Sequence, residues 1–225
     1  MTQLSDEVLI AVIGVALTSD AEEVGRVRKL AALASTCASE GECEVRDAAL
    51  AEAVRVLAAA RHRRGANAGE IAPSALGLGR ECEELRCHKL ARDAFGVGIT
   101  ALENEQEDPL LGLLWNGMGN AWCRDGEGAE ALESYRKAAQ LKKSSEDLSS
   151  RLATLLSLIE AEAQWGSPEG CDEAFAQAVS VVRTATGAGG QQLDSDLALR
   201  LGSLAEELER PAVTREAYEL TAVQQ

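Results

Sequence analysis

Residues 112–143 read GLLWNGMGNAWCRDGEGAEALESYRKAAQLKK and carry two helical patterns in succession. The first half places large and small apolar residues three and four apart, the spacing that puts side chains on one helix face: Trp115, Met118, Gly119 and Trp122. After a turn at Gly126, the second half has its own pattern of small and aromatic residues: Ala131, Tyr135 and Ala138. The stretch therefore predicts two antiparallel helices that approach closely, with Trp122 and Tyr135 buried and Gly119 at a close helix contact.

This pattern resembles the tetratricopeptide repeat, which carries W-x2-L-G-x2-Y on its first helix and A-x3-F on its second. The closing proline of that family is missing, and Lys143 stands near its place. The resemblance implies an all-α fold, a right-handed α-solenoid of antiparallel helix pairs. It also implies a concave groove lined by the first helix of each pair, where a protein segment binds.

The pattern recurs along the chain at intervals of 40, 40 and 43 residues. The first-helix positions are Gly79, Gly119, Ile159 and Gly202. The aromatic second-helix positions are Phe95, Tyr135, Phe175 and Tyr218. One copy is strong and three are degenerate, so an unrelated helical bundle with similar spacing is the alternative. We expect residues 67–225 to form the repeat array and residues 1–66 to form N-terminal helices, either a cap or a diverged repeat.

Helix boundaries are marked by proline and glycine. All four prolines, among them Pro109 and Pro168 after the capping residues Asp108 and Ser167, precede apolar stretches and are expected near helix starts. No segment alternates in the manner of a strand. The sequence predicts about eleven helices, mostly of about 12–20 residues, joined by short loops.

Composition excludes several classes of partner. The chain has 225 residues and a formal charge of −15, whereas a nucleic-acid surface needs clustered lysine and arginine. The basic run 61–64 is interpreted as a helix end, where cations complement the helix dipole. The longest apolar run, 8–17, is too short to span a membrane and follows two acids, unlike a signal peptide. We expect no nucleic acid partner and no membrane insertion.

The six cysteines are expected to be free thiols. Cys82, Cys87 and His88 look faintly like a metal ligand set, but zinc pairs usually stand two to four residues apart and no second pair follows. Neither a metal nor another cofactor is therefore expected. Free, packed thiols favour a reducing compartment. We expect the cytoplasm, and an organelle after removal of a presequence stays open.

Catalysis lacks an apparatus in this sequence. The two histidines, His62 and His88, each stand beside positive charge, and no nucleophile motif, phosphate-binding loop or H-E-x-x-H motif is present. The chain is therefore predicted not to be an enzyme. A small-molecule sensor or enzyme is the weakest of the alternatives.

The expected partner-binding groove consists of Arg80, Leu113, Asn116, Asn120, Arg124 and Glu160. Asparagine is a poor helix former, so Asn116 and Asn120 at an i, i+4 spacing invite a binding role, with their amides facing the backbone of an extended peptide. Arg124 is suited to holding a carboxylate. The alternative is that both asparagines are merely tolerated on the surface. Family members that clamp chaperone tails use lysines, which this groove lacks.

These observations predict an interaction module: a scaffold, adaptor or assembly factor that binds a protein segment in the groove. The alternative is a chaperone-like holder of one unassembled or exported client. The acidic charge favours a protein or peptide partner with a basic surface. Membership of a larger complex and a homo-oligomer both stay open.

Overall fold

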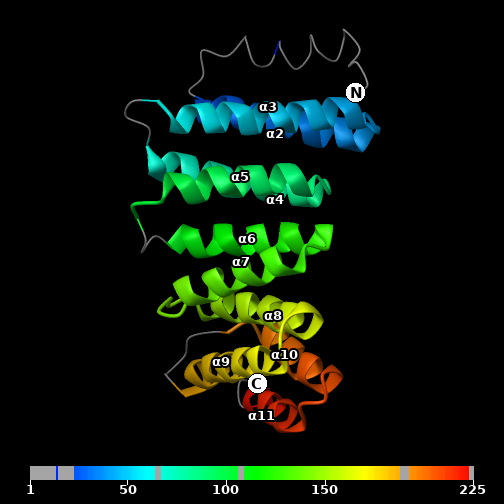
Figure 1. The fold of residues 1–225 in the computed structure, drawn as a ribbon, viewed down its shortest axis with the longest axis vertical. Coiled ribbons are helices and arrows are strands. Elements are labelled where there is room, and N and C mark those ends of the chain that lie inside the picture. Colours follow the sequence, from blue (N-terminus) through cyan, green and yellow to red (C-terminus); the bar gives the residue numbers. More distant parts are fainter. Residues whose placement is uncertain (1–13, 15–22, 64–66, 106–108, 188–192, 223–225) are drawn as a thin grey trace. The chain divides into compact units, whose positions relative to one another are not determined.

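The structure is a computed structural model that describes residue 14 and residues 23–63, 67–105, 109–187 and 193–222. These residues form ten helices of 12 to 20 residues and no strand (Figure 1). The prediction of an all-helical chain is confirmed. The chain divides into two compact units, residues 1–125 and 126–225.

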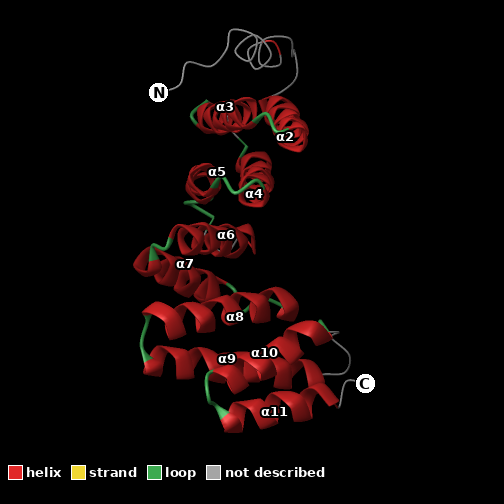
Figure 2. Cartoon of the chain, turned by 90° about the vertical axis from the view of Figure 1, so that its right-hand side faces the viewer, coloured by secondary structure: helices red, strands yellow, loops and turns green. Residues whose placement is uncertain are grey.

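The first unit contains α2 (Glu23–Glu40), α3 (Cys43–Arg61), α4 (Ala68–Glu84), α5 (His88–Ala101) and α6 (Pro109–Asp125). Successive helices reverse direction, so the first helices of the pairs form one layer, with α2 against α4 and α4 against α6 (Figure 2). The second helices, α3 and α5, form the other layer. We call the solvent-facing side of α2, α4 and α6 the first-helix face.

The second unit contains α7 (Gly128–Leu141), α8 (Leu148–Trp165), α9 (Pro168–Gly187), α10 (Ser195–Glu207) and α11 (Pro211–Ala222). Here α8 pairs with α9 and α10 pairs with α11, while α7 packs on α8. The expected pairing of the helix over 109–124 with the helix over 127–142 joins the two units and stays a prediction. The handedness of the whole array also stays a prediction.

A left-handed residue ends four of the helices. Gly41 and Gly126 have φ values of 83° and 80°, and the non-glycine residues Arg86 and Glu209 have values of 59° and 55°. A residue of this conformation just after a helix lets the next backbone amides return to the last carbonyls. The next helix can then start within two or three residues, so the helix pairs are tight.

Two of the recurring small and aromatic positions touch each other, at Phe95 in the core and at Tyr218, which is 39% exposed. A Cβ atom on Gly79 would lie 2.2 Å from the Phe95 ring, and one on Gly117 would lie 2.5 Å from it. Phe95 is thus held between α4 and α6 with no exposed surface. In the last pair, a Cβ on Gly202 would lie 2.7 Å from the Tyr218 ring. The same glycine–aromatic contact therefore recurs between the corresponding positions of two helix pairs.

Two packing predictions have different outcomes. Tyr135 is buried, as predicted, with 3% of its surface exposed. Trp122 is only half-buried, which corrects the expectation that it is a core residue. The guanidinium of Arg92 lies over its indole ring, 4.1 Å from the ring centroid, so this face of Trp122 packs on a cation near the surface. Gly119 is buried.

The proline prediction holds at three of four positions. Pro109, Pro168 and Pro211 are the first residues of their helices, where the missing N–H costs nothing. Pro73 instead lies inside α4, which starts earlier because Asn67 accepts a 3.0 Å bond from the amide of Gly69. Pro73 lies on the exposed side of α4.

The N-terminal region contributes a helix pair, α2 and α3, to the first unit. Part of the expected cap, residues 1–13 and 15–22, lies outside the described residues, so its role stays a prediction.

At the site of the missing closing proline, α7 ends at Leu141 and the ammonium of Lys142 turns into the protein. It donates 2.9 and 2.8 Å bonds to the hydroxyls of Ser150 and Thr154 on α8.

Candidate functional site

A polar cluster lies where α4 and α6 pack together. Arg80 and Glu83 come from α4, three residues apart, and Asn120 and Arg124 come from α6, four residues apart, so each pair shares one helix face. The Asn120 side chain hydrogen-bonds the Glu83 carboxylate, and both guanidinium groups act on that carboxylate electrostatically. The structure therefore brings together three predicted groove residues, Arg80, Asn120 and Arg124, around an acid.

Glu83 is the half-buried centre of this cluster. Burial raises the pKa of Glu83 to about 7, although Arg80, Arg124 and the hydrogen bond from Asn120 each oppose the rise. Desolvation of the charged form therefore outweighs two nearby cations. The carboxyl group exchanges its proton near neutral pH, so the charge of the cluster changes in that range.

Asn116 lies one turn before Asn120 on α6. Its side-chain oxygen is buried and has no hydrogen-bond partner in the protein. A buried carbonyl oxygen without a donor is unfavourable by about 1–3 kcal/mol, so Asn116 carries a cost within the fold.

The expectation that both asparagines point freely outward is corrected. Both are half-buried, because α6 packs on α4 and encloses this side of the helix. Asn120 has a role inside the protein, since it bonds Glu83.

Two other predicted groove residues do not join the cluster. Leu113 packs against the hydrophobic core of the first unit. Glu160 belongs to α8 in the second unit, where it forms an ion pair with Arg200 of α10. The cluster thus combines Arg80, Asn116, Asn120 and Arg124 with Glu83, whose importance the sequence alone did not show.

A hollow of about 500 Å³ lies beside this cluster, between α2 and α4. Its walls are mainly small and apolar, with Arg28, Glu70 and Glu81 at the rim. Gly77 lines the hollow, and Arg80 lies three residues further along the same exposed strip of α4. The hollow therefore lies on one side of α4, against α2, and the polar cluster lies on the other side, against α6.

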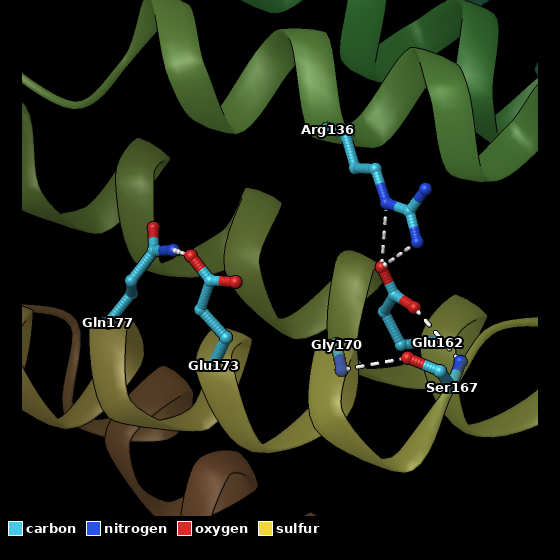
Figure 3. A network of polar contacts seen from close by, with 6 residues as sticks. All are labelled: Arg136, Glu162, Ser167, Gly170, Glu173 and Gln177. Atoms are coloured by element: carbon cyan, nitrogen blue, oxygen red, sulfur yellow. Dashed lines mark hydrogen bonds and ion pairs between the residues drawn. The ribbon is translucent and has the colours of Figure 1, made fainter.

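The second unit holds a separate buried acid, Glu162 (Figure 3). Its carboxylate accepts 2.8 and 2.7 Å bonds from Arg136 and a 3.3 Å bond from the amide of Ser167, just before α9. A Cβ on Gly166 or Gly170 would lie 2.0 or 2.5 Å from the carboxylate, so the two glycines make room for it. Because its bonds are made within the protein, Glu162 is a structural link from α7 to the start of α9.

The two histidines lie in different environments. His62 is exposed, and His88 buries a ring nitrogen without a partner. Within the described residues, no three of His, Cys, Asp and Glu are grouped to hold a metal ion. None of the helices described is both long and apolar enough to cross a membrane.

Comparison with known proteins identifies the fold. No protein family and no curated protein sequence matches the chain. Solved structures do match, among them BtubC (BKLC) from P. vanneervenii, with a TM-score of 0.61 and 11% identity over 97% of this chain and 87% of that one. The fold is that of a tetratricopeptide-like helical repeat protein.

A second match carries that repeat in its description. It is a putative kinesin light chain from Podosopora anserina with nearly identical TPR-like repeats, at a TM-score of 0.57 and 16% identity. The match covers 91% of this chain and 97% of the other. The TPR-like resemblance predicted from residues 112–143 is confirmed at the level of fold.

Proposed function

We propose that this TPR-like protein is an interaction module that binds an extended protein segment on the first-helix face of its first unit. The observation that carries the proposal is the cluster between α4 and α6, where Arg80 and Arg124 flank Glu83 and Asn120. Both arginines are exposed, so their guanidinium groups are available to a partner.

The chemistry of the face favours a peptide ligand. Each arginine offers a fork of donors that fits a carboxylate. The neighbouring hollow between α2 and α4 accommodates a small apolar side chain. Two interhelical spacings of about 8–10 Å, crossed at about 3.3 Å per residue, correspond to about six residues of extended chain.

The overall charge shapes the rest of the interaction. At −15, the protein attracts a partner whose wider surface is basic, and association should slow as salt rises. A partner can carry both a carboxylate that contacts the arginines and a basic surface around it. The carboxylate acts through direct contact, whereas the basic surface is attracted by the net charge of the protein over a longer distance. The proposed setting is a reducing compartment inside the cell, consistent with six free cysteines.

The test is co-purification with mass spectrometry, comparing the parent with an Arg80→Ala, Arg124→Ala double variant. Both side chains are exposed, so the fold should survive, which circular dichroism verifies. Arg200→Ala, an exposed arginine on a first helix of the other unit, is the matched control. Loss of the partner in the double variant alone supports the proposal. Unchanged capture, or cross-links that map to α3 and α5, contradicts it.

The same experiment separates the two roles open to such a module. A stable set of folded partners indicates a scaffold or assembly factor. One client, captured in a protease-sensitive form, indicates a chaperone-like holder. Sedimentation of the purified chain alone then shows whether it self-associates.

A further inference from the structure

Three of the six cysteines gather around the turn between α4 and α5. Cys82 lies in the last turn of α4 and has no exposed surface. Cys87 is the residue just before α5 and is half-buried. Cys43, at the start of α3, is exposed and acts electrostatically on Cys87. The proposed function uses none of these thiols.

The backbone of the turn holds Cys82 and Cys87 together. The amide of Cys87 donates a 2.8 Å bond to the carbonyl of Cys82, and the amide of Arg86 donates a 3.0 Å bond to that of Glu83. With Arg86 in the left-handed conformation, these two bonds define a Schellman motif. In this motif the side chains at the positions of Cys82 and Cys87 commonly contact each other.

We propose that Cys82 and Cys87 form an oxidation site, which a small-molecule disulfide converts into an intramolecular disulfide. The backbone bonds between the two residues fix their spacing within one turn, so no helix has to move. A disulfide needs Cα atoms about 4.4–6.8 Å apart, a range that suits residues joined across such a turn.

The reaction is a two-step exchange with a disulfide such as oxidised glutathione. The Cys87 thiolate attacks one glutathione sulfur, forms a mixed disulfide and releases one glutathione thiolate. The Cys82 sulfur then attacks the Cys87 sulfur, which forms the internal bond and releases the second glutathione. The two cysteines give up two protons and two electrons. The two released glutathione thiolates take up the protons, so one oxidised glutathione becomes two reduced molecules.

The surroundings of Cys87 make the first step slow. Burial raises the pKa of Cys87, and its thiol donates a 3.4 Å bond to Asp47 on α3, which raises that pKa further. The nearby Arg46 opposes the rise, and Cys43 adds to it. Burial likewise raises the pKa of Cys82 to about 12. The exchange should therefore speed up with rising pH, since the thiolate is the attacking form.

The experiment treats the reduced 225-residue chain with oxidised glutathione near pH 8, blocks the remaining thiols and digests with trypsin. Cleavage after Arg80, Arg86 and Lys89 separates the two cysteines. The expected product is peptide 81–86 joined to peptide 87–89, without glutathione and sensitive to reductant. Glutathione that remains on Cys87 of the parent, or a link from Cys87 to Cys43, overturns the proposal.

Three single variants test which cysteines form the link and how Asp47 affects its rate. Cys82→Ser should retain glutathione on Cys87, whereas Cys43→Ser should leave the link intact. Asp47→Asn should accelerate the link several-fold, because the thiolate loses a neighbouring negative charge. If Cys87 stays unmodified in the Asp47→Asn variant near pH 9, the proposal also fails.

The preceding helix pair supplies a matched control. Cys37 occupies the same position of the same motif, with the amide of Glu42 donating a 2.8 Å bond to its carbonyl. Cys37 should form no internal bond in the parent. Glu42→Cys should give Cys37 a partner across that turn and form a second link under the same conditions. Failure of that link would contradict the claim that the turn geometry itself suffices.

Discussion

Glu83 is expected to destabilise the folded protein at neutral pH, and Glu83→Gln should relieve the cost. The folded-state pKa is raised from 4.5 to about 7, so the folded protein holds this proton more tightly than the unfolded chain does. Below about pH 4.5 Glu83 is protonated in both the folded and the unfolded state, so it does not lower the free energy of unfolding. Between about pH 4.5 and 7 the unfolded chain ionises first, so stability falls as pH rises.

The size of the effect follows from that change in pKa. A rise from 4.5 to about 7 corresponds to about 3 kcal/mol in the free energy of unfolding. The side chain keeps some contact with water, and solvent screening should reduce the measured gain to about 1–2 kcal/mol. Glutamine retains an oxygen for the bond from Asn120, so the variant loses little else.

Urea unfolding of the parent and the variant, in matched buffers from about pH 5 to 8, measures the difference. The gain from Glu83→Gln should be small at about pH 5, grow as pH rises and level off above about pH 7. Glu84→Gln, an exposed neighbour on the same helix, is the control. A difference that does not vary with pH, or a variant less stable than the parent at about pH 8, refutes this account of Glu83.

Three further changes test the packing by thermal or urea unfolding. Gly79→Ala should lower the free energy of unfolding by about 1–3 kcal/mol because its Cβ meets the Phe95 ring. Gly77→Ala, with no atom within 4 Å of its Cβ, should instead stabilise α4 by up to about 1 kcal/mol. Equal effects of the two substitutions would contradict the close contact. Arg86→Gly should stabilise the turn by up to about 1 kcal/mol by removing left-handed strain, and a loss of stability would contradict this. Arg136→Ala should cost about 1–3 kcal/mol by leaving Glu162 buried without its cation; an unchanged midpoint would show that the pair contributes nothing.

Periodicity predicted the architecture because packing itself is periodic. Gly79 and Phe95 were matched to Gly119 and Tyr135 by a 40-residue step, and the Gly79–Phe95 contact is real. Trp122 was misassigned to the core because a helix pattern gives the face of a residue but not its depth. Pro73 was misplaced because Asn67 starts α4 earlier than the proline suggests.

The candidate site was harder to predict, since it depends on which helices meet. Arg80 and Arg124 are far apart in sequence and become neighbours only when α4 packs on α6. Nothing in the sequence distinguishes Glu83 from the adjacent Glu81 and Glu84. Its burial between two helices makes the difference, and burial of one acid among several is a tertiary property.

The close contact of Gly79 and Gly117 with the Phe95 ring restricts which substitutions can accumulate at these positions during evolution. Gly79 and Gly117 each leave room for the same ring of Phe95, so neither can gain a side chain while that ring stays. A smaller residue at position 95 would leave space for a side chain at both glycine positions. We therefore expect two kinds of relative. One kind keeps Gly79, Phe95 and Gly117, and the other has a larger residue at 79 or 117 together with a smaller one at 95. That joint substitution pattern would identify this contact in an alignment of such relatives.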